Sequence, residues 1–157
     1  MDIPAISQAI EVCAAHLDAT LTHGTEVEAY LVGYLLTLIY AEYEKKLSDI
    51  VIDKAKASGS AEITTYVGNT IGQVLRGIKL SEISGLLGKF DDKCKQGFSD
   101  SIKDTPAANS YSRLVSHRID FAHRGVLQIS FAELQAAYAE SHIILDNFGV
   151  VLGVTST

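Results

Sequence analysis

The residues of this chain best suited to chemistry are arginines and histidines gathered in one short segment, Arg113–Gly125. It holds three of the chain's arginines and two of its five histidines, in a protein whose formal net charge is −6. A histidine titrating near neutral pH can accept or donate a proton. A guanidinium can hold two phosphoryl oxygens in a fork. Arg118 and His123 therefore carry the two kinds of group that metal-free cleavage of RNA needs.

The spacing of these two residues constrains how they could work together. Five positions on an α-helix amount to about 500°, so Arg118 and His123 point about 140° apart. They cannot form a pair on one face of a single helix. They could both line a groove shared with the same helix of a second copy of the chain.

The sequence Arg118-Ile-Asp-Phe-Ala-His123 resembles the Arg-x4-to-6-His motif of the HEPN superfamily, the small all-helical ribonuclease domains of toxin–antitoxin and defence systems. Leu114-Val115 and Ala122-His123 are most similar to the RiboL-PSP-HEPN branch. The resemblance implies a homodimeric, metal-independent endoribonuclease that acts on RNA, with the site at the dimer interface. It also implies a possible cognate antitoxin or inhibitor protein as a partner.

The resemblance assigns a role to each residue of the motif helix. Arg118 would stabilise charge on the phosphoryl group, and His123 would act as general base or acid, with both protomers contributing. Branch members often have a glutamate on the second helix, and Glu44 is its best match, although a pairing with a nearby lysine explains that residue equally well. The residues expected to bind the substrate are His117, Arg124, Arg113 and Asp120, of which Arg113 is nearly as well explained as exposed helix charge.

The sequence departs from the family pattern in three places, and the first departure favours an alternative function, a non-catalytic HEPN-like dimerisation or adaptor module with a degenerate site. Ile119 stands where the branch has a polar residue, and Asp120 comes one position later. Arg124 replaces the usual glycine after the histidine. Gly125 stands where toxins regulated by tyrosine modification have their tyrosine. The acidic net charge also favours the alternative, because phosphate contacts need positive charge.

The absence of several sequence motifs argues against other classes of protein. The chain has no GxxxxGK[ST] phosphate loop, no HExxH, no GxSxG and no Cys/His zinc cluster, so we expect neither a cofactor nor a metal. Cys13 and Cys94 are predicted to be reduced core thiols. The start of the chain lacks the basic region of a signal peptide, and the most apolar run, Ala29 to Ala41, is too short to cross a bilayer. We therefore expect a cytoplasmic protein with no membrane segment.

Hydrophobic periodicity predicts an all-α fold with a single domain over residues 1–157. We expect an up-and-down helical bundle, similar to HEPN domains, with a long second helix and additional short helices. A capping box at Thr25–Glu28 opens the long helix, which is predicted to bend at residues 42–46 and to bury Tyr30 and Tyr34. The predicted helices cover residues 4–22, 25–58, 60–78, 81–90, 91–97, 105–125 and 130–148.

Residues 60–78 combine a helical apolar pattern with glycines and threonines that lower helix propensity, so a strand remains an alternative. Ser81 is predicted to cap the next helix, and residues 99–105 to form a polar connection. Ser130 to Glu133 is a second capping box, and the apolar tail at residues 150–154 is expected to pack on the body or on a partner.

Overall fold

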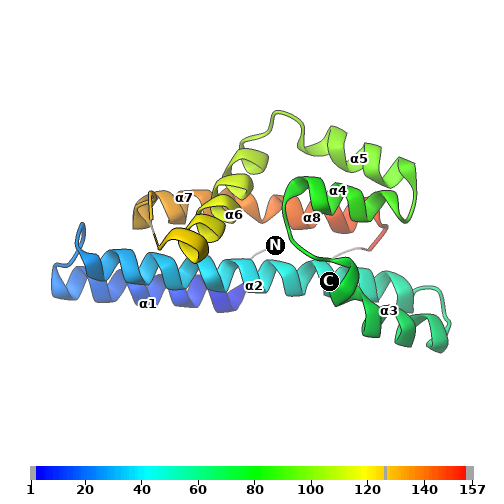
Figure 1. Ribbon diagram of the computed structural model, residues 1–157, viewed down its shortest axis with the longest axis horizontal. Coiled ribbons are helices and arrows are strands. Elements are labelled where there is room, and N and C mark those ends of the chain that lie inside the picture. Colours follow the sequence, from blue (N-terminus) through cyan, green and yellow to red (C-terminus); the bar gives the residue numbers. More distant parts are fainter. Residues whose placement is uncertain (1–2, 126, 155–157) are drawn as a thin grey trace.

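The computed structural model describes residues 3–125 and 127–154, and over these residues all regular secondary structure is helical, with no strand. The prediction of an all-α bundle is therefore confirmed (Figure 1). The helices are α1 (Pro4–Thr20), α2 (Glu26–Lys56), α3 (Ala61–Val74), α4 (Leu80–Gly88), α5 (Asp92–Ile102), α6 (Pro106–Arg124), α7 (Phe131–Ser141) and α8 (Ile143–Val151).

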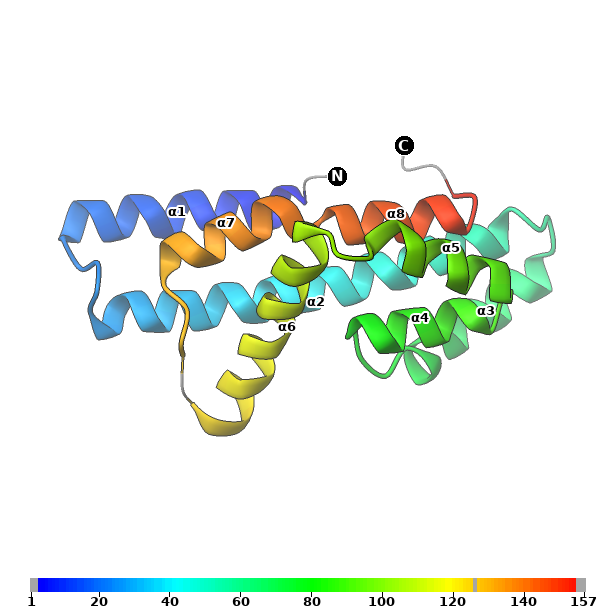
Figure 2. The ribbon, with the colours of Figure 1, turned by 90° about the horizontal axis from the view of Figure 1, so that it is seen from above.

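Helix α2 is the axis of the molecule, and it is unbroken through residues 42–46. Figures 1 and 2 show α1 running antiparallel to the first half of α2, and α3 folding back along the second half. Helices α7 and α8 run one after the other along another side of α2, and α4 and α5 form a pair beside α8. Helix α6 packs on both α2 and α7, and its C-terminal end projects past α2 (Figure 2).

Buried aromatic rings join these helices at the centre of the fold. The rings of Tyr43 on α2 and Tyr111 on α6 are stacked, with centroids 5.6 Å apart and planes 4° from parallel. Both hydroxyls are satisfied: that of Tyr43 is 2.6 Å from Ser141 Oγ, and that of Tyr111 donates to the Ile78 carbonyl at 2.8 Å. Because buried polar groups are costly without a partner, the first bond holds α7 against α2 and the second holds α6 against the segment that precedes α4.

The predicted capping box at the start of α2 forms only in part. Thr25 caps the helix as expected, its Oγ1 accepting from the Val27 amide at 3.2 Å. The Glu28 carboxylate does not return to Thr25; it accepts from the Gly24 amide at 2.7 Å and from the Phe131 amide at 2.8 Å. Phe131 is the first residue of α7, so a tertiary partner has replaced the local one. Glu28 thus ties the start of α2 to the start of α7.

Several predicted boundaries are corrected. The helix predicted over residues 60–78 is confirmed and the strand alternative is rejected, but the helix is shorter than predicted: Ser60 caps α3, which ends at Val74. Ser81 is not a cap, because α4 begins one residue earlier and the Glu82 carboxylate accepts from the Lys79 amide at 2.8 Å. The polar connection is shorter than expected, because α5 continues to Ile102, whose side chain is buried.

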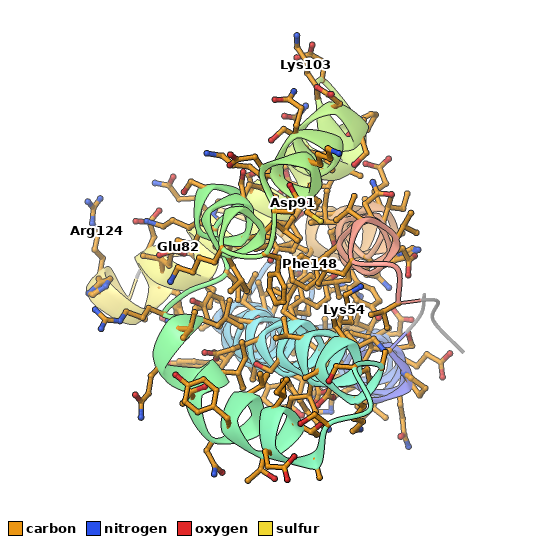
Figure 3. The ribbon with its side chains drawn as sticks, turned by 90° about the vertical axis from the view of Figure 1, so that its right-hand side faces the viewer. Lys54, Glu82, Asp91, Lys103, Arg124 and Phe148 are labelled. Carbon is orange, nitrogen blue, oxygen red and sulfur yellow. The ribbon has the colours of Figure 1, made fainter. Side chains whose placement is uncertain are left out.

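The last predicted helix divides into α7 and α8 at His142. Its capping box is confirmed, with Ser130 and Glu133 bonded in both directions. In the tail, Leu152 is buried, Val151 and Val154 pack against the core and Val150 is exposed, so the described part of the tail packs on the body. Figure 3 shows Phe148 of α8 in the interior between α8 and α2.

The buried face of α2 differs from the predicted one. Tyr30 and Tyr34 were expected in the core but are 71% and 55% exposed, whereas Val32 and Leu36 are buried in their place. The reason is that α6 and α7 cover the opposite side of the helix from these tyrosines. The molecule is left with an aromatic, uncharged strip on its surface.

Candidate functional site

The motif helix α6 has the ends that the sequence predicts. Thr105 caps it by accepting from the Ala108 amide at 3.2 Å, and Pro106 occupies the first turn. Gly125 ends it in the left-handed conformation, with φ of 64° and its amide donating to the Phe121 carbonyl at 2.9 Å. The last turn of α6 therefore holds His123 and Arg124, where the helix dipole favours positive charge.

The C-terminal half of α6 is seated on α2 by the motif's own aromatic residue. The Phe121 ring lies against Gly33, and a Cβ added at Gly33 would stand only 2.5 Å from Phe121 Cζ. The glycine thus leaves room for the ring and for close approach of the two helices. This contact determines how closely the residues around Phe121 approach α2.

Arg118 lies one turn before Phe121 and also faces α2. Its Cζ is 4.4 Å from the centroid of the Tyr40 ring, the geometry of a cation–π contact. Burial raises the pKa of the Tyr40 phenol, the charge of Glu44 adds to that rise, and Arg118 opposes it. Glu44 is therefore close enough to act on the same aromatic ring. Within the described residues Arg118 forms no ion pair, so its charge is held by a ring and not neutralised by a carboxylate.

His123 does not join Arg118 within one copy of the chain. Arg118 is half-buried against α2, while His123 is exposed on the last turn of α6. This separation agrees with the angle of about 140° expected from helix geometry. A single copy therefore does not assemble the predicted catalytic pair.

The structure brings together a different set of the predicted residues. A surface hollow of about 190 Å³ is lined by His117, Asp120, Arg124 and Gln128. The first three lie three and four positions apart, on one face of α6. Gln128 comes from the segment after α6, and the sequence analysis missed it because no motif or spacing connects it to the helix. Figure 3 shows Arg124 at the outer edge of the molecule, at the end of α6.

Arg113, also predicted to bind substrate, forms an ion pair with another residue of the same chain. Its Nη2 lies 3.3 Å from Glu133 Oε1. The pKa of Glu133 is lowered, first by hydrogen bonds from the Ser130 amide and hydroxyl and then by Arg113. Arg113 thus links α6 to the capped start of α7, and the pair is exposed, so its contribution to stability is small.

The described residues contain no cluster of histidine, cysteine, aspartate or glutamate placed to hold a metal ion. Both cysteines are free. Cys13 is buried in the core as predicted, whereas Cys94 is only half-buried and donates to the Val151 carbonyl at 3.3 Å. Among the helices of residues 3–125 and 127–154, none has the length and apolar character needed to span a membrane.

Fold and site together define an all-helical protein whose motif helix carries an arginine held on an aromatic ring and a separate polar hollow. Comparison with known proteins adds nothing to this definition, because no family model, no curated protein and no solved structure matches the chain.

Proposed function

We propose that the protein is a metal-independent endoribonuclease of the HEPN type, from a toxin–antitoxin or defence system, acting as a homodimer with a composite Arg/His site. The observation that carries the proposal is the placement of Arg118. Its guanidinium lies over Tyr40, half-buried and without an ion pair in the described part of the chain, on the same helix as the exposed His123. Such an arginine has its charge available to a phosphate.

The proposed reaction breaks the bond between phosphorus and the 5′-oxygen of RNA. The ribose 2′-oxygen attacks phosphorus, and a 2′,3′-cyclic phosphate forms as the 5′-oxygen leaves. One His123 takes the proton from the 2′-hydroxyl, and a second, protonated His123 gives a proton to the leaving oxygen. Arg118 stabilises the charge that builds on the phosphoryl oxygens. Two proton transfers at one phosphate need two histidines, which is why we place the site between two copies.

An uncharged face on α1 and α2 offers a surface for association of two copies. It lies on the side of α2 away from α6 (Figure 2), so the composite Arg/His site needs a further contact between the two α6 helices. Helices α1 and α2 present a groove of about 280 Å³ lined by Ala5, Gln8, Ala9, Val12, Cys13 and Tyr34. Val12 is 63% exposed, and Tyr30 beside the groove is 71% exposed. From residue 29 to residue 41, α2 carries no charge on any side, including the side that faces away from the core. A helix that is apolar all round is usually buried all round.

A second copy of the chain is a suitable partner for this uncharged face. Each copy has a net charge of −6, so two copies repel one another over most of their surface. Contact between two uncharged faces avoids that repulsion, and exposed tyrosines are enriched in the cores of protein interfaces. The packing of one α1–α2 pair on another gives a four-helix arrangement.

The nuclease proposal is tested by incubating purified protein with single-stranded RNA in EDTA. Wild-type protein is expected to cleave, and Arg118→Ala and His123→Ala to lose cleavage by about 100-fold or more, the usual size of an electrostatic or general acid–base contribution. Arg76→Ala and His16→Ala are matched controls, because both residues are exposed and lie off α6. Arg118→Lys keeps a cation near Tyr40 without the fork and is expected to cleave slowly. Equal RNA profiles in all samples would end the proposal.

A second function, that of an adaptor, is favoured by another surface. Helices α2, α3 and α4 form an apolar groove of about 190 Å³ lined by Val51, Tyr66, Val67, Thr70, Ile71, Val74, Leu86, Lys89 and Phe90. A protein partner bound there would use the chain as a helical scaffold without catalysis. Expression in bacteria separates the two functions: a toxin slows growth, and His123→Ala relieves the effect, whereas an adaptor gives equal growth with both.

A further inference from the structure

The hollow on α6 is lined by both hydrogen-bond donors and hydrogen-bond acceptors that are not bonded to other protein groups. The carboxylate of Asp120 faces the same space as the cationic or polar side chains of Arg124, His117 and Gln128. Over the described residues, none of these four side chains has a hydrogen bond or an ion pair to the protein. Donors and acceptors in the hollow are therefore open to a ligand.

The carboxylate decides what kind of ligand fits. A phosphate placed between Arg124 and His117 would lie beside the Asp120 carboxylate, and like charges repel. A neutral ligand with both donors and acceptors suits the hollow better. The bases of single-stranded RNA are such ligands, because their Watson–Crick and Hoogsteen edges are free to bind side chains. The hollow is thus better suited to a base than to the phosphate contacts expected from the sequence.

Among the four RNA bases, guanine matches this set of side chains best. Its Watson–Crick edge has two adjacent donors, N1–H and the N2 amino group, which can pair with the two oxygens of one carboxylate. Its O6 and N7 are acceptors, and arginine is their commonest partner. Adenine and cytosine each offer a carboxylate one amino group, and uracil offers one N–H. We propose that the hollow binds guanine, with Asp120 on N1–H and N2–H and Arg124 on O6 or N7.

Guanine binding in the hollow does not depend on the proposed nuclease. Only its consequence, a preference for cleavage next to guanine, rests on the proposed function. Asp120 is one helical turn before His123 on α6, so a base held in the hollow lies beside the general acid or base. RNA would then be cut next to guanines. Because Gln128 lines the hollow from the segment after α6, it can contact the base edge alongside Asp120.

Binding of nucleosides tests the proposal without any cleavage. Guanosine, adenosine, cytidine and uridine are titrated into wild-type protein and followed by amide chemical shifts in NMR spectra. Guanosine is expected to bind about tenfold more tightly than the others, and its shifts to fall on α6 and Gln128. Asp120→Asn, which replaces one acceptor with a donor, is expected to remove that preference. The control Asp49→Asn changes an exposed aspartate on α2 and is expected to keep it.

The outcomes separate this proposal from the nuclease. Equal binding of the four nucleosides, no binding, or a guanosine preference that survives Asp120→Asn with native circular dichroism would overturn the guanine site. Guanosine preference in a protein that cleaves no RNA would support the hollow and reject the nuclease. Cleavage at all four bases alike, abolished by His123→Ala, in a protein that binds the four nucleosides equally would support the nuclease and reject the guanine site.

Discussion

The guanidinium of Arg118 lies over the ring of Tyr40, with Cζ 4.4 Å from the ring centroid. The arginine belongs to α6 and the tyrosine to α2, so the contact crosses between two helices. It holds a long, rotamer-rich side chain in one place before any ligand arrives, which lowers the entropy cost of binding an anion. The ring also leaves the charge of the guanidinium uncompensated, unlike a carboxylate partner.

Removal of the Tyr40 ring should therefore release Arg118. Tyr40→Leu is expected to lower the free energy of unfolding by about 0.5–1 kcal/mol through the lost cation–π contact, with some further loss of packing. It is also expected to slow RNA cleavage although Arg118 remains. Tyr40→Phe keeps the ring and serves as the control, with activity near that of the wild type. Urea unfolding and cleavage rates measure both effects; equal rates in the two variants would contradict the role given to Tyr40.

Because Phe121 contacts Gly33, replacing this glycine by alanine should change stability in the opposite direction from the one that helix propensity predicts. Inside a helix, alanine is more stabilising than glycine by about 1 kcal/mol. Gly33→Ala is nevertheless expected to destabilise by about 1–3 kcal/mol, because its Cβ would overlap the Phe121 ring. Gly68→Ala in α3, where nothing lies within 4 Å, is the matched control and should stabilise. Equilibrium unfolding in urea measures both changes.

A double variant isolates the overlap itself. If the ring is the obstacle, Gly33→Ala combined with Phe121→Leu should lose less than the sum of the two single changes, because the smaller side chain makes room for the new methyl group. Additive losses would show that Gly33 is needed for some other reason.

Much of this fold could be predicted because its signals are local. The ends of α6 and the start of α7 follow from Thr105, Gly125 and Ser130, each of which satisfies backbone groups within three or four residues of itself. The position of His123 in the last turn follows from the same signals. The angle between Arg118 and His123 could be predicted from the geometry of an α-helix alone.

What could not be predicted depends on contacts between distant segments. Glu28 fits a local capping box, yet it bonds the Phe131 amide 103 residues away, and no pattern in the sequence indicates that partner. Gln128 joins the hollow only because the chain turns back after Gly125. Tyr30 and Tyr34 have the spacing of core residues, and their exposure depends on which side of α2 the other helices cover.

Glu28 should make the fold sensitive to acid. Backbone hydrogen bonds from Phe131 and then Gly24 lower the pKa of its carboxyl. A carboxyl with a depressed folded-state pKa stabilises the fold above its ordinary pKa of 4.5, and that stabilisation is lost as pH falls through the lower value. Glu28→Gln is expected to cost about 1–2 kcal/mol at pH 7 and progressively less below pH 4.5. Urea unfolding at several pH values checks this, with the exposed Glu26→Gln as control.

The buried tyrosines should make the fold sensitive to alkali. Burial raises the pKa of both Tyr43 and Tyr111 above the ordinary value of 10.0. A raised folded-state pKa means that stability is complete below pH 10 and is lost as pH rises further, because only the unfolded chain releases the proton. Each tyrosine is expected to lower the free energy of unfolding by up to about 1.4 kcal/mol per pH unit. Tyr43→Phe should make that slope shallower; an unchanged slope would contradict the assignment.

The uncharged face of α1 and α2 gives a prediction about assembly. Tyr34→Glu places a carboxylate at the centre of the proposed interface, where a second copy would bring an identical charge and exclude water, so the dimer is expected to dissociate. Tyr66→Glu on α3 is the matched control, because Tyr66 is also an exposed aromatic residue on a helix, at 69%, and is expected to leave the dimer intact. Light scattering gives the mass of each variant. If Tyr34→Glu keeps the mass of the wild-type dimer while Tyr66→Glu halves it, the interface lies on α3, and the proposed contact through α1 and α2 is rejected.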